Sequence, residues 1–504
     1  MRRLALALLM LPLLAGKRAS VPPPTMLEDG PVVSLNPLYP VTAGDRRLAA
    51  LVYDPIFFPN PSGGGWTSLV LETWSAEPDG RLRLTVRKGL KWHDGEEAEA
   101  ADLCATVSAL TAERTTAVIA RLARLAPATC SVDSEDLRVA WVTPTVREAE
   151  PWRHLAVPLL PSHRVGGAVA FTDLQTPMGT GPYRARFDGH LWRFEDAGAV
   201  HRRAPVPVLE RAWAPLAAAR LGALRAGGAQ AIIELAPPDL LELRGEEAYT
   251  LRFVDRRRWT GLLLDTSDGP LADPAIRLAV DQALDRSALR DEVTGVDLER
   301  EVQPVTVLTG PGPHESPRYN RGVPLPKPDL EAAKAAVGDG ITLRLGVDPG
   351  ADAGPRLADA LTHRLGVAGF TVERVELTPE AWFDEVLSGA RADALDVVLV
   401  TFDSDHDMDH WLHTRRDDRG ALQPFTAGHP ELDRALDDVR RSSDRNAALR
   451  ELHALLADNR ALIPLWQTDA WTAWRSEWFE HQPISARDYF GAIERWTPKD
   501  QKAK

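Results

Sequence analysis

The chain has 504 residues, which exceeds what one hydrophobic core normally supports, so two or three domains are expected. Hydrophobic residues make up 44% of the chain, as is typical of a folded soluble protein. The formal net charge of −13 argues against a nucleic-acid groove, which requires clustered Lys and Arg. Because no Walker loop, dinucleotide fingerprint, Gly-x-Ser-x-Gly or His-Glu-x-x-His pattern occurs, we expect no enzymatic activity, no cofactor and no resident metal.

The N-terminal segment has the order of a secretory signal peptide. Arg2 and Arg3 precede an apolar run from Leu4 to Gly16, and Lys17 ends the run. The run is shorter than the roughly 20 apolar residues that cross a bilayer. We therefore expect residues 1–19 to be an export signal. The end of the run looks like a bacterial lipoprotein box, but Lys17 stands where the modified Cys would be, which excludes lipid anchoring there.

The first strongly patterned segment predicts a β-hairpin followed by a helix. Asp79-Gly80 is a typical tight-turn pair. Leu82, Leu84 and Val86 then alternate with polar residues, which predicts a strand with one buried face. Glycines and polar residues break this strand, and a helix is expected to begin near Glu97.

The two cysteines fall in this region. Cys104 is expected on the helix, and Cys130 begins the next predicted strand. In an oxidising compartment they could form a disulfide, whereas two buried free thiols are the alternative. The sequence leaves both open, and neither cysteine has a metal-ligand spacing.

The remainder of the chain changes from β-rich to α/β organisation. Residues 48–165 are expected to be mostly strands, with a short helix at 117–125. Asp273-Pro274 is a typical helix start, because Asp caps the first turn and Pro fits its first position. From residue 341 onward, strands alternate with helices, which predicts a largely parallel sheet covered by helices. Ligands of such sheets bind beyond the carboxyl ends of strands, which here directs attention to the segment after residue 400.

Residues 401–413 are unusually rich in Asp and His, and three interpretations compete. The carboxylates and imidazoles could bind a metal, with His410 and His413 on one helix face. An ionised Asp at a strand end could instead hold a substrate ammonium group. The Asp residues could also simply cap the following helix.

Several of these segments resemble the family 5 extracytoplasmic solute-binding proteins, the peptide, dipeptide and nickel receptors of ABC importers. The resemblance covers roughly residues 35 to 495. The matching segments are Leu82 to Gly95 with Ala100-Ala101-Asp102-Leu103, Met178 to Tyr183, Leu221 to Pro238, Ile276-Arg277-Leu278-Ala279 with Asp285-Arg286, and Pro464-Leu465-Trp466.

The resemblance implies an α/β fold of the second periplasmic-binding-protein type, with two lobes built on mixed sheets and an extra β-rich domain. Lobe I would comprise residues 20–47, 170–265 and 466–495, the extra domain 48–169 and lobe II 266–465. A monomeric, periplasmic or otherwise extracytoplasmic receptor would capture peptides between the lobes and deliver them to the permease subunits of an ABC transporter.

The resemblance also suggests ligand-binding residues. Asp405, with Asp403 in reserve, matches the residue that grips a peptide's α-amino group, and Phe402 matches an aromatic residue of the pocket. Tyr53-Asp54 and Glu234 match two further segments that line the cleft. A nickel-type metal-chelate receptor is the alternative. A second alternative, from a different class of protein, is a metal-dependent hydrolase that uses residues 401–413.

Overall fold

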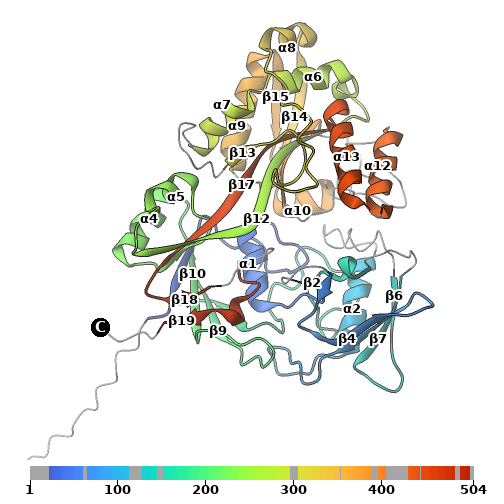
Figure 1. Cartoon of the computed structure of the whole chain (residues 1–504), viewed down its shortest axis with the longest axis vertical. Coiled ribbons are helices and arrows are strands. Elements are labelled where there is room, and N and C mark those ends of the chain that lie inside the picture. The colour runs from blue at the N-terminus through green and yellow to red at the C-terminus, as the bar shows by residue number, and fades with distance from the viewer. Residues whose placement is uncertain are drawn as a thin grey trace, which may run out of the picture.

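The computed structural model describes residues 22–60, 65–112, 128–144, 151–295, 305–351, 353–386, 395–403, 429–442, 444–482 and 489–499. It shows two lobes, one above the other in Figure 1, joined by two long strands. Within the described ranges, no helix is both long enough and apolar enough to cross a membrane. The helix predicted at 117–125 lies outside these ranges.

A mixed eleven-stranded sheet extends through both lobes. Its order is β15-β14-β16-β12-β17-β11-β1-β10-β9-β8, and β13 pairs with β17 beside this path. We use lobe I for the part that contains β1 and β8–β11, and lobe II for the part that contains β13–β16. The strands are β1 (Thr25–Glu28), β8 (Tyr183–Phe187), β9 (Trp192–Asp196), β10 (Val208–Trp213), β11 (Ala231–Ile232), β12 (Tyr249–Leu264), β13 (Val305–Val307), β14 (Ile341–Val347), β15 (Phe370–Val375), β16 (Val397–Asp403) and β17 (Leu462–Arg475).

The parallel pairing predicted after residue 341 is restricted to three strands. Strand β14 is parallel to β15 and β16, whereas β16 is antiparallel to β12 and β12 is antiparallel to β17. The sheet is therefore mixed, because two strands that enter from lobe I complete it. Residues 397–400 of β16, the last of these parallel strands, are buried.

Helices cover the sheet of lobe II and one side of lobe I (Figure 1). At the predicted start of α6, the Asp273 carboxylate accepts a hydrogen bond from the Ala275 amide, as a helix cap should. The helices of lobe I are α1 (Ala43–Val52), α4 (Ala217–Ala226), α5 (Pro237–Leu243) and the single turns η1 (Pro151–Leu155) and η6 (Ile493–Arg495). Those of lobe II are η2 (Pro270–Ala272), α6 (Pro274–Gln282), α7 (Arg286–Thr294), α8 (Leu330–Val337), α9 (Gly354–Val367), α10 (Pro379–Ala381), η3 (Trp382–Val386), α12 (Pro430–Arg441) and α13 (Arg445–Asn459).

A separate four-stranded sheet, with order β4-β5-β7-β6, carries α2 and adjoins lobe I. The predicted turn joins β4 to β5, and Gly80 adopts a φ of 90° that favours glycine. Helix α2 begins at Ala100 rather than near Glu97, and Cys104 on it forms a disulfide with Cys130. The elements here are β4 (Leu71–Ala76), β5 (Leu82–Val86), α2 (Ala100–Thr111), β6 (Ala128–Val132) and β7 (Val139–Pro144), with the small pairs β2 (Phe58–Pro59)/β3 (Trp66–Thr67) and β18 (Phe479–His481)/β19 (Thr497–Pro498) elsewhere.

Candidate functional site

The two crossing strands are built to bend where they pass between the lobes. Strands β12 and β17 pair along most of their length, but their register shifts between Val254 and Arg257 and again between Thr260 and Gly261. Such irregularities interrupt the hydrogen-bond ladder and let strands bend. The residues between these two shifts, 257–260, therefore mark the part of β12 where the lobes would move relative to each other.

An aromatic pair closes one face of this junction. Phe402 on β16 lies opposite Trp259 on β12 in the strand register, and their rings stack with centroids 4.1 Å apart. Phe402, the aromatic residue predicted for the pocket, is fully buried in this arrangement. The next residue, Asp403, is the register partner of Arg258. Asp405 and the rest of the Asp/His segment lie outside the described residues.

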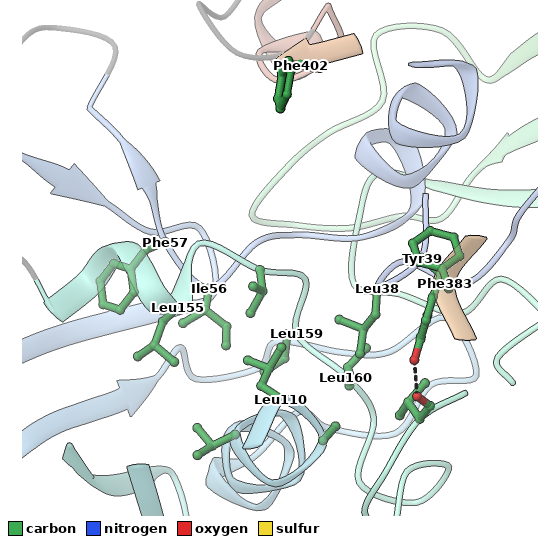
Figure 2. Packing of buried hydrophobic residues seen from close by; sticks show 14 of the residues in the cluster. Leu38, Tyr39, Ile56, Phe57, Leu110, Leu155, Leu159, Leu160, Phe383 and Phe402 are labelled. Atoms are coloured by element: carbon green, nitrogen blue, oxygen red, sulfur yellow. Dashed lines mark hydrogen bonds between the residues drawn. The ribbon is translucent and has the colours of Figure 1, made fainter. Parts of the chain in front are cut away.

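Aromatic side chains also join the lobes away from the crossing strands. Phe383 of lobe II lies 4.9 Å from the ring of Tyr39 and stacks on Phe171 at 5.5 Å, and both of these belong to lobe I. Figure 2 shows the first two rings side by side, with the Tyr39 hydroxyl donating a hydrogen bond to the Val169 carbonyl at 2.6 Å. Tyr39 and Phe383 are both buried. The apolar core therefore continues from one lobe into the other.

A second contact between the lobes involves a glycine. Gly350 lies in the loop after β14 and packs on the backbone just before α1. A Cβ atom added to Gly350 would lie 2.1 Å from the Val41 carbonyl oxygen, a distance that no side chain tolerates. Together with the Phe383 contacts, this packing holds the two lobes against each other in this structure.

Glu234 occupies a strained position next to the crossing strands. It follows β11 with a φ of 57°, a left-handed conformation that is uncommon for residues other than glycine. Its carboxylate accepts hydrogen bonds from Arg47 at 2.5 Å and from Arg258 at 2.9 Å. Arg47 is shared with Glu28, which also pairs with Arg211. A buried ion chain thus connects α1 and β1 of lobe I to crossing strand β12.

The charges within this chain stabilise one another. Burial alone would raise the pKa of Glu28, but the guanidinium groups of Arg211 and Arg47 lower it to about 2. The carboxylate therefore remains ionised throughout the physiological range. Since Arg258 is the member on β12, Glu234 is held by a residue of the segment expected to bend.

Tyr53 and Asp54 make their contacts inside lobe I. The Asp54 carboxylate accepts hydrogen bonds from Arg202 at 3.0 Å, His201 at 2.7 Å and Thr180 at 2.9 Å. Burial acts to raise the pKa of Asp54, but these partners, led by His201 and Arg202, lower it to about 2. Burial raises the pKa of Tyr53 to about 12, and its hydroxyl accepts a hydrogen bond from the Met178 amide.

The structure thus separates the predicted site residues into two groups. Phe402, Asp403 and Glu234 lie at or beside the crossing strands, and Arg258 is the neighbour that Asp403 and Glu234 share. Asp54 has no contact with any of them among the described residues. Sequence reasoning missed Arg47, Arg258 and Phe383. The one signal that could have found any of them is at Phe383, which lies among the apolar residues that follow Thr378-Pro379, a typical helix start.

The sequence profile of the bacterial extracellular solute-binding proteins, family 5, matches residues 66–418. The chain belongs to this family. The predicted resemblance and the predicted fold class are thereby confirmed. Proteins of this family are extracytoplasmic and bind peptides or other small ligands for ABC importers.

Individual relatives agree with this assignment. Protein XP55 of Streptomyces lividans is 26% identical over 415 residues, which cover 75% of this chain and 72% of the relative. The oligopeptide-binding protein AppA of Bacillus subtilis, solved with a nonapeptide, superposes with a TM-score of 0.77 at 17% identity, covering 95% of this chain and 100% of AppA. AgaA from A. tumefaciens R10, solved with agropinic acid, gives 0.77 at 15% identity, with 95% and 99% coverage. NikZ of Campylobacter jejuni, solved with Ni(L-His), gives 0.70 at 16% identity, with 95% and 100% coverage.

Proposed function

We propose that the protein captures peptides between lobes I and II and delivers them to the permease of an ABC importer. Membership of family 5 carries this proposal. The structures of relatives hold a nonapeptide in one case and the dipeptide Met-Leu, in a protein from Pseudoalteromonas, in another. The same family also includes receptors for an opine and for a nickel chelate, so the choice of peptide rests on the residues of this chain.

The feature of this chain that favours a peptide ligand is an acidic residue at or just after the end of β16. An ionised Asp405, or Asp403 in its place, would hold the peptide's α-ammonium group through charge-assisted hydrogen bonds. Phe402 would fix the base of this segment through its stacking on Trp259. Glu234, which Arg258 already links to β12, would border the same region from lobe I.

Closure of the lobes would couple capture to delivery. A ligand that contacts both lobes binds the closed state more tightly than the open state, so it shifts the population towards closure. The Phe383 and Gly350 contacts exist only when the lobes are together, and they would add to the stability of the closed state. The permease would then distinguish loaded from empty receptors by their shape.

Export and domain organisation complete the proposal. Residues 1–19 would direct the chain out of the cytoplasm, and the mature protein would act as a monomer. The predicted lobe and domain bounds remain predictions, with β12 and β17 as the connections between the lobes. Residues 48–169 of the predicted extra domain pack on lobe I through contacts such as Asp54 with Arg202, and we count them with lobe I.

Calorimetric titration of residues 21–504 with a pool of short peptides tests this function. We expect peptides to bind and the substitution Asp405→Ala to weaken binding about 10- to 100-fold, the range that follows from losing a hydrogen bond to a charged group. Asp339→Ala, an exposed Asp of lobe II, should bind as the unchanged protein does. N-acetylated peptides, which lack the ammonium group, should fail to bind.

Other outcomes distinguish the alternatives. Binding of Ni²⁺ with histidine, with no response to peptides, would assign the protein to metal-chelate capture. Peptide binding that is insensitive to Asp405→Ala and to N-acetylation would retain the receptor but remove the ammonium site from this segment.

A further inference from the structure

A small cavity in lobe I has no part in the proposed capture of peptides. Its volume is about 130 Å³, and its walls come from three segments: the loop after β5, the turn before β8 with β8 itself, and the loop after β9. Lys91, His93, Arg184 and His201 are the charged and imidazole side chains among its lining residues. The contacts that join lobe I to lobe II involve none of these four residues.

The charged side chains that line the cavity are basic, in a chain whose net charge is −13. No acidic side chain lines it. Lys91 and Arg184 are exposed, and neither makes an ion pair with any of the residues that the structure describes. The nearby acids are already engaged, because Asp94 pairs with His163 at 3.0 Å and Asp54 is enclosed by its three partners. Lys91 and Arg184 are therefore available to pair with an anion.

Both imidazoles are held in fixed orientations. The His93 ring lies between the Gly179 amide, at 3.4 Å from Nδ1, and the Gly181 carbonyl, at 3.0 Å from Nε2. Nε2 therefore carries the proton and Nδ1 accepts. Nε2 of His201 lies 2.7 Å from the Asp54 carboxylate and donates to it, because that carboxylate is ionised. Both rings are thus bonded to protein groups through Nε2 and serve as walls of the cavity.

We propose that this cavity binds a small inorganic oxyanion of the phosphate or sulfate type. A guanidinium group pairs with such an anion through two parallel hydrogen bonds, and a lysine adds a point charge. Lys91 and Arg184 approach from separate segments, so an anion with four acceptor oxygens can meet both, whereas a carboxylate offers only two oxygens on one side. Since a water molecule takes about 30 Å³ of liquid volume, the cavity has room for one such anion and its nearest waters but not for a peptide.

The anion would connect segments that are distant in the sequence. Lys91 and His93 belong to the loop that leads to α2, whereas Arg184 and His201 belong to the β8–β9 hairpin region. An anion bound by residues of both segments would link the β8–β9 hairpin to the loop between β5 and α2. Binding would therefore stabilise lobe I without a change in the cleft between the lobes.

Titration of the full mature chain with inorganic phosphate tests the site. Isothermal calorimetry at constant ionic strength, with chloride as the compensating anion, should show saturable binding of phosphate, and sulfate should compete with it. Arg184→Gln should weaken binding at least tenfold, and Lys91→Gln should weaken it by a smaller factor. Both side chains are exposed, so we expect both variants to fold normally. Arg186→Gln is the matched control, since Arg186 is on the same strand, is exposed and does not line the cavity.

Three outcomes would overturn the proposal. The first is the absence of saturable binding by either phosphate or sulfate. The second is an equal loss in Arg184→Gln and Arg186→Gln, because that would indicate diffuse attraction to a basic surface. The third is binding of acetate alone, which would indicate a carboxylate site. Since the peptide titration uses different ligands and different variants, either proposal can fail while the other stands.

Discussion

Two glycines make similar close contacts with backbone carbonyl groups, one within lobe I and the other between the two lobes. A Cβ atom on Gly179 would lie 2.0 Å from the Val52 carbonyl oxygen, and a Cβ atom on Gly350 would lie 2.1 Å from the Val41 carbonyl oxygen. The first contact lies within lobe I, where it is permanent. The second joins lobe II to lobe I, so we expect it to form only when the proposed closure brings the lobes together. The same small substitution should therefore alter stability at one position and ligand affinity at the other.

The largest effect is expected at Asp54, inside lobe I. Asp54→Asn should lower the free energy of unfolding by about 4 kcal/mol, because it removes the fully buried carboxylate that pairs with Arg202 and leaves only Glu494 to balance that guanidinium. Urea denaturation measures this loss, with the exposed Asp339→Asn as control. Normal stability combined with lost peptide affinity would instead show that Asp54 contacts the ligand, as the sequence predicts.

Gly179→Ala should follow, with a loss of about 3 kcal/mol of unfolding free energy, because the added methyl group meets backbone atoms that cannot move aside. Gly166→Ala is the matched control in lobe I, since a Cβ atom there meets nothing within 4 Å. The comparison is again made by urea denaturation. Equal stability of the two variants would mean that the turn before β8 shifts to accommodate the methyl group at little cost in free energy.

The contrast between local and distant contacts also explains what the sequence could predict. The alternation at Leu82, Leu84 and Val86 and the cap at Asp273 depend on neighbouring residues, and both predictions are confirmed. The parallel pairing was overestimated because β12, the neighbour of β16 on the side away from β14, enters from lobe I and comes from far away in the chain.

The candidate site depends on still more distant pairs. Arg47 and Glu234 are separated by 187 positions, and nothing near either residue in the sequence indicates the other. The contact of Phe383 with Tyr39 is equally hidden from the sequence, because a helix pattern identifies an apolar face but not the residues that pack on it. The family resemblance placed Glu234 near the cleft, whereas the arginines that bind it became visible only in the structure.

Gly350→Ala should act on the closed state alone. Overpacking of one methyl group between the lobes should cost about 2 kcal/mol, which corresponds to roughly 30-fold weaker peptide binding, with unfolding free energy unchanged. Calorimetry measures the affinity, and small-angle scattering should show a larger radius of gyration with ligand than for the unchanged protein. Gly366→Ala, in open space on α9, is the matched control. Unchanged affinity would show that the lobes close without this contact.

The most gradual effect is expected from acid, and it should arise within lobe II. His453 on α13 is buried, its Nδ1 accepts a hydrogen bond from the Asn320 amide at 2.9 Å, and its ring packs on Tyr319. Burial lowers the pKa of His453 to about 4 from the usual 6.5. Below pH 6.5 the unfolded chain binds a proton that the folded chain does not bind until about pH 4. Stability should therefore fall with pH across this window, by about 1.4 kcal/mol per pH unit at most.

Urea denaturation at pH 6.5, 5.5 and 4.5 tests this origin, with His453→Gln compared with the exposed His190→Gln. His453→Gln should have the flatter pH dependence, because glutamine does not titrate and its carbonyl oxygen can still accept the Asn320 amide. Since Asn320 and Tyr319 belong to the same lobe as α13, acid should weaken lobe II itself and leave the contacts between the lobes intact. If acid instead reduced peptide affinity in parallel with stability, and His453→Gln removed both effects, the segment held by His453 would have to take part in closure. The boundary between permanent and closure-dependent contacts would then lie inside lobe II.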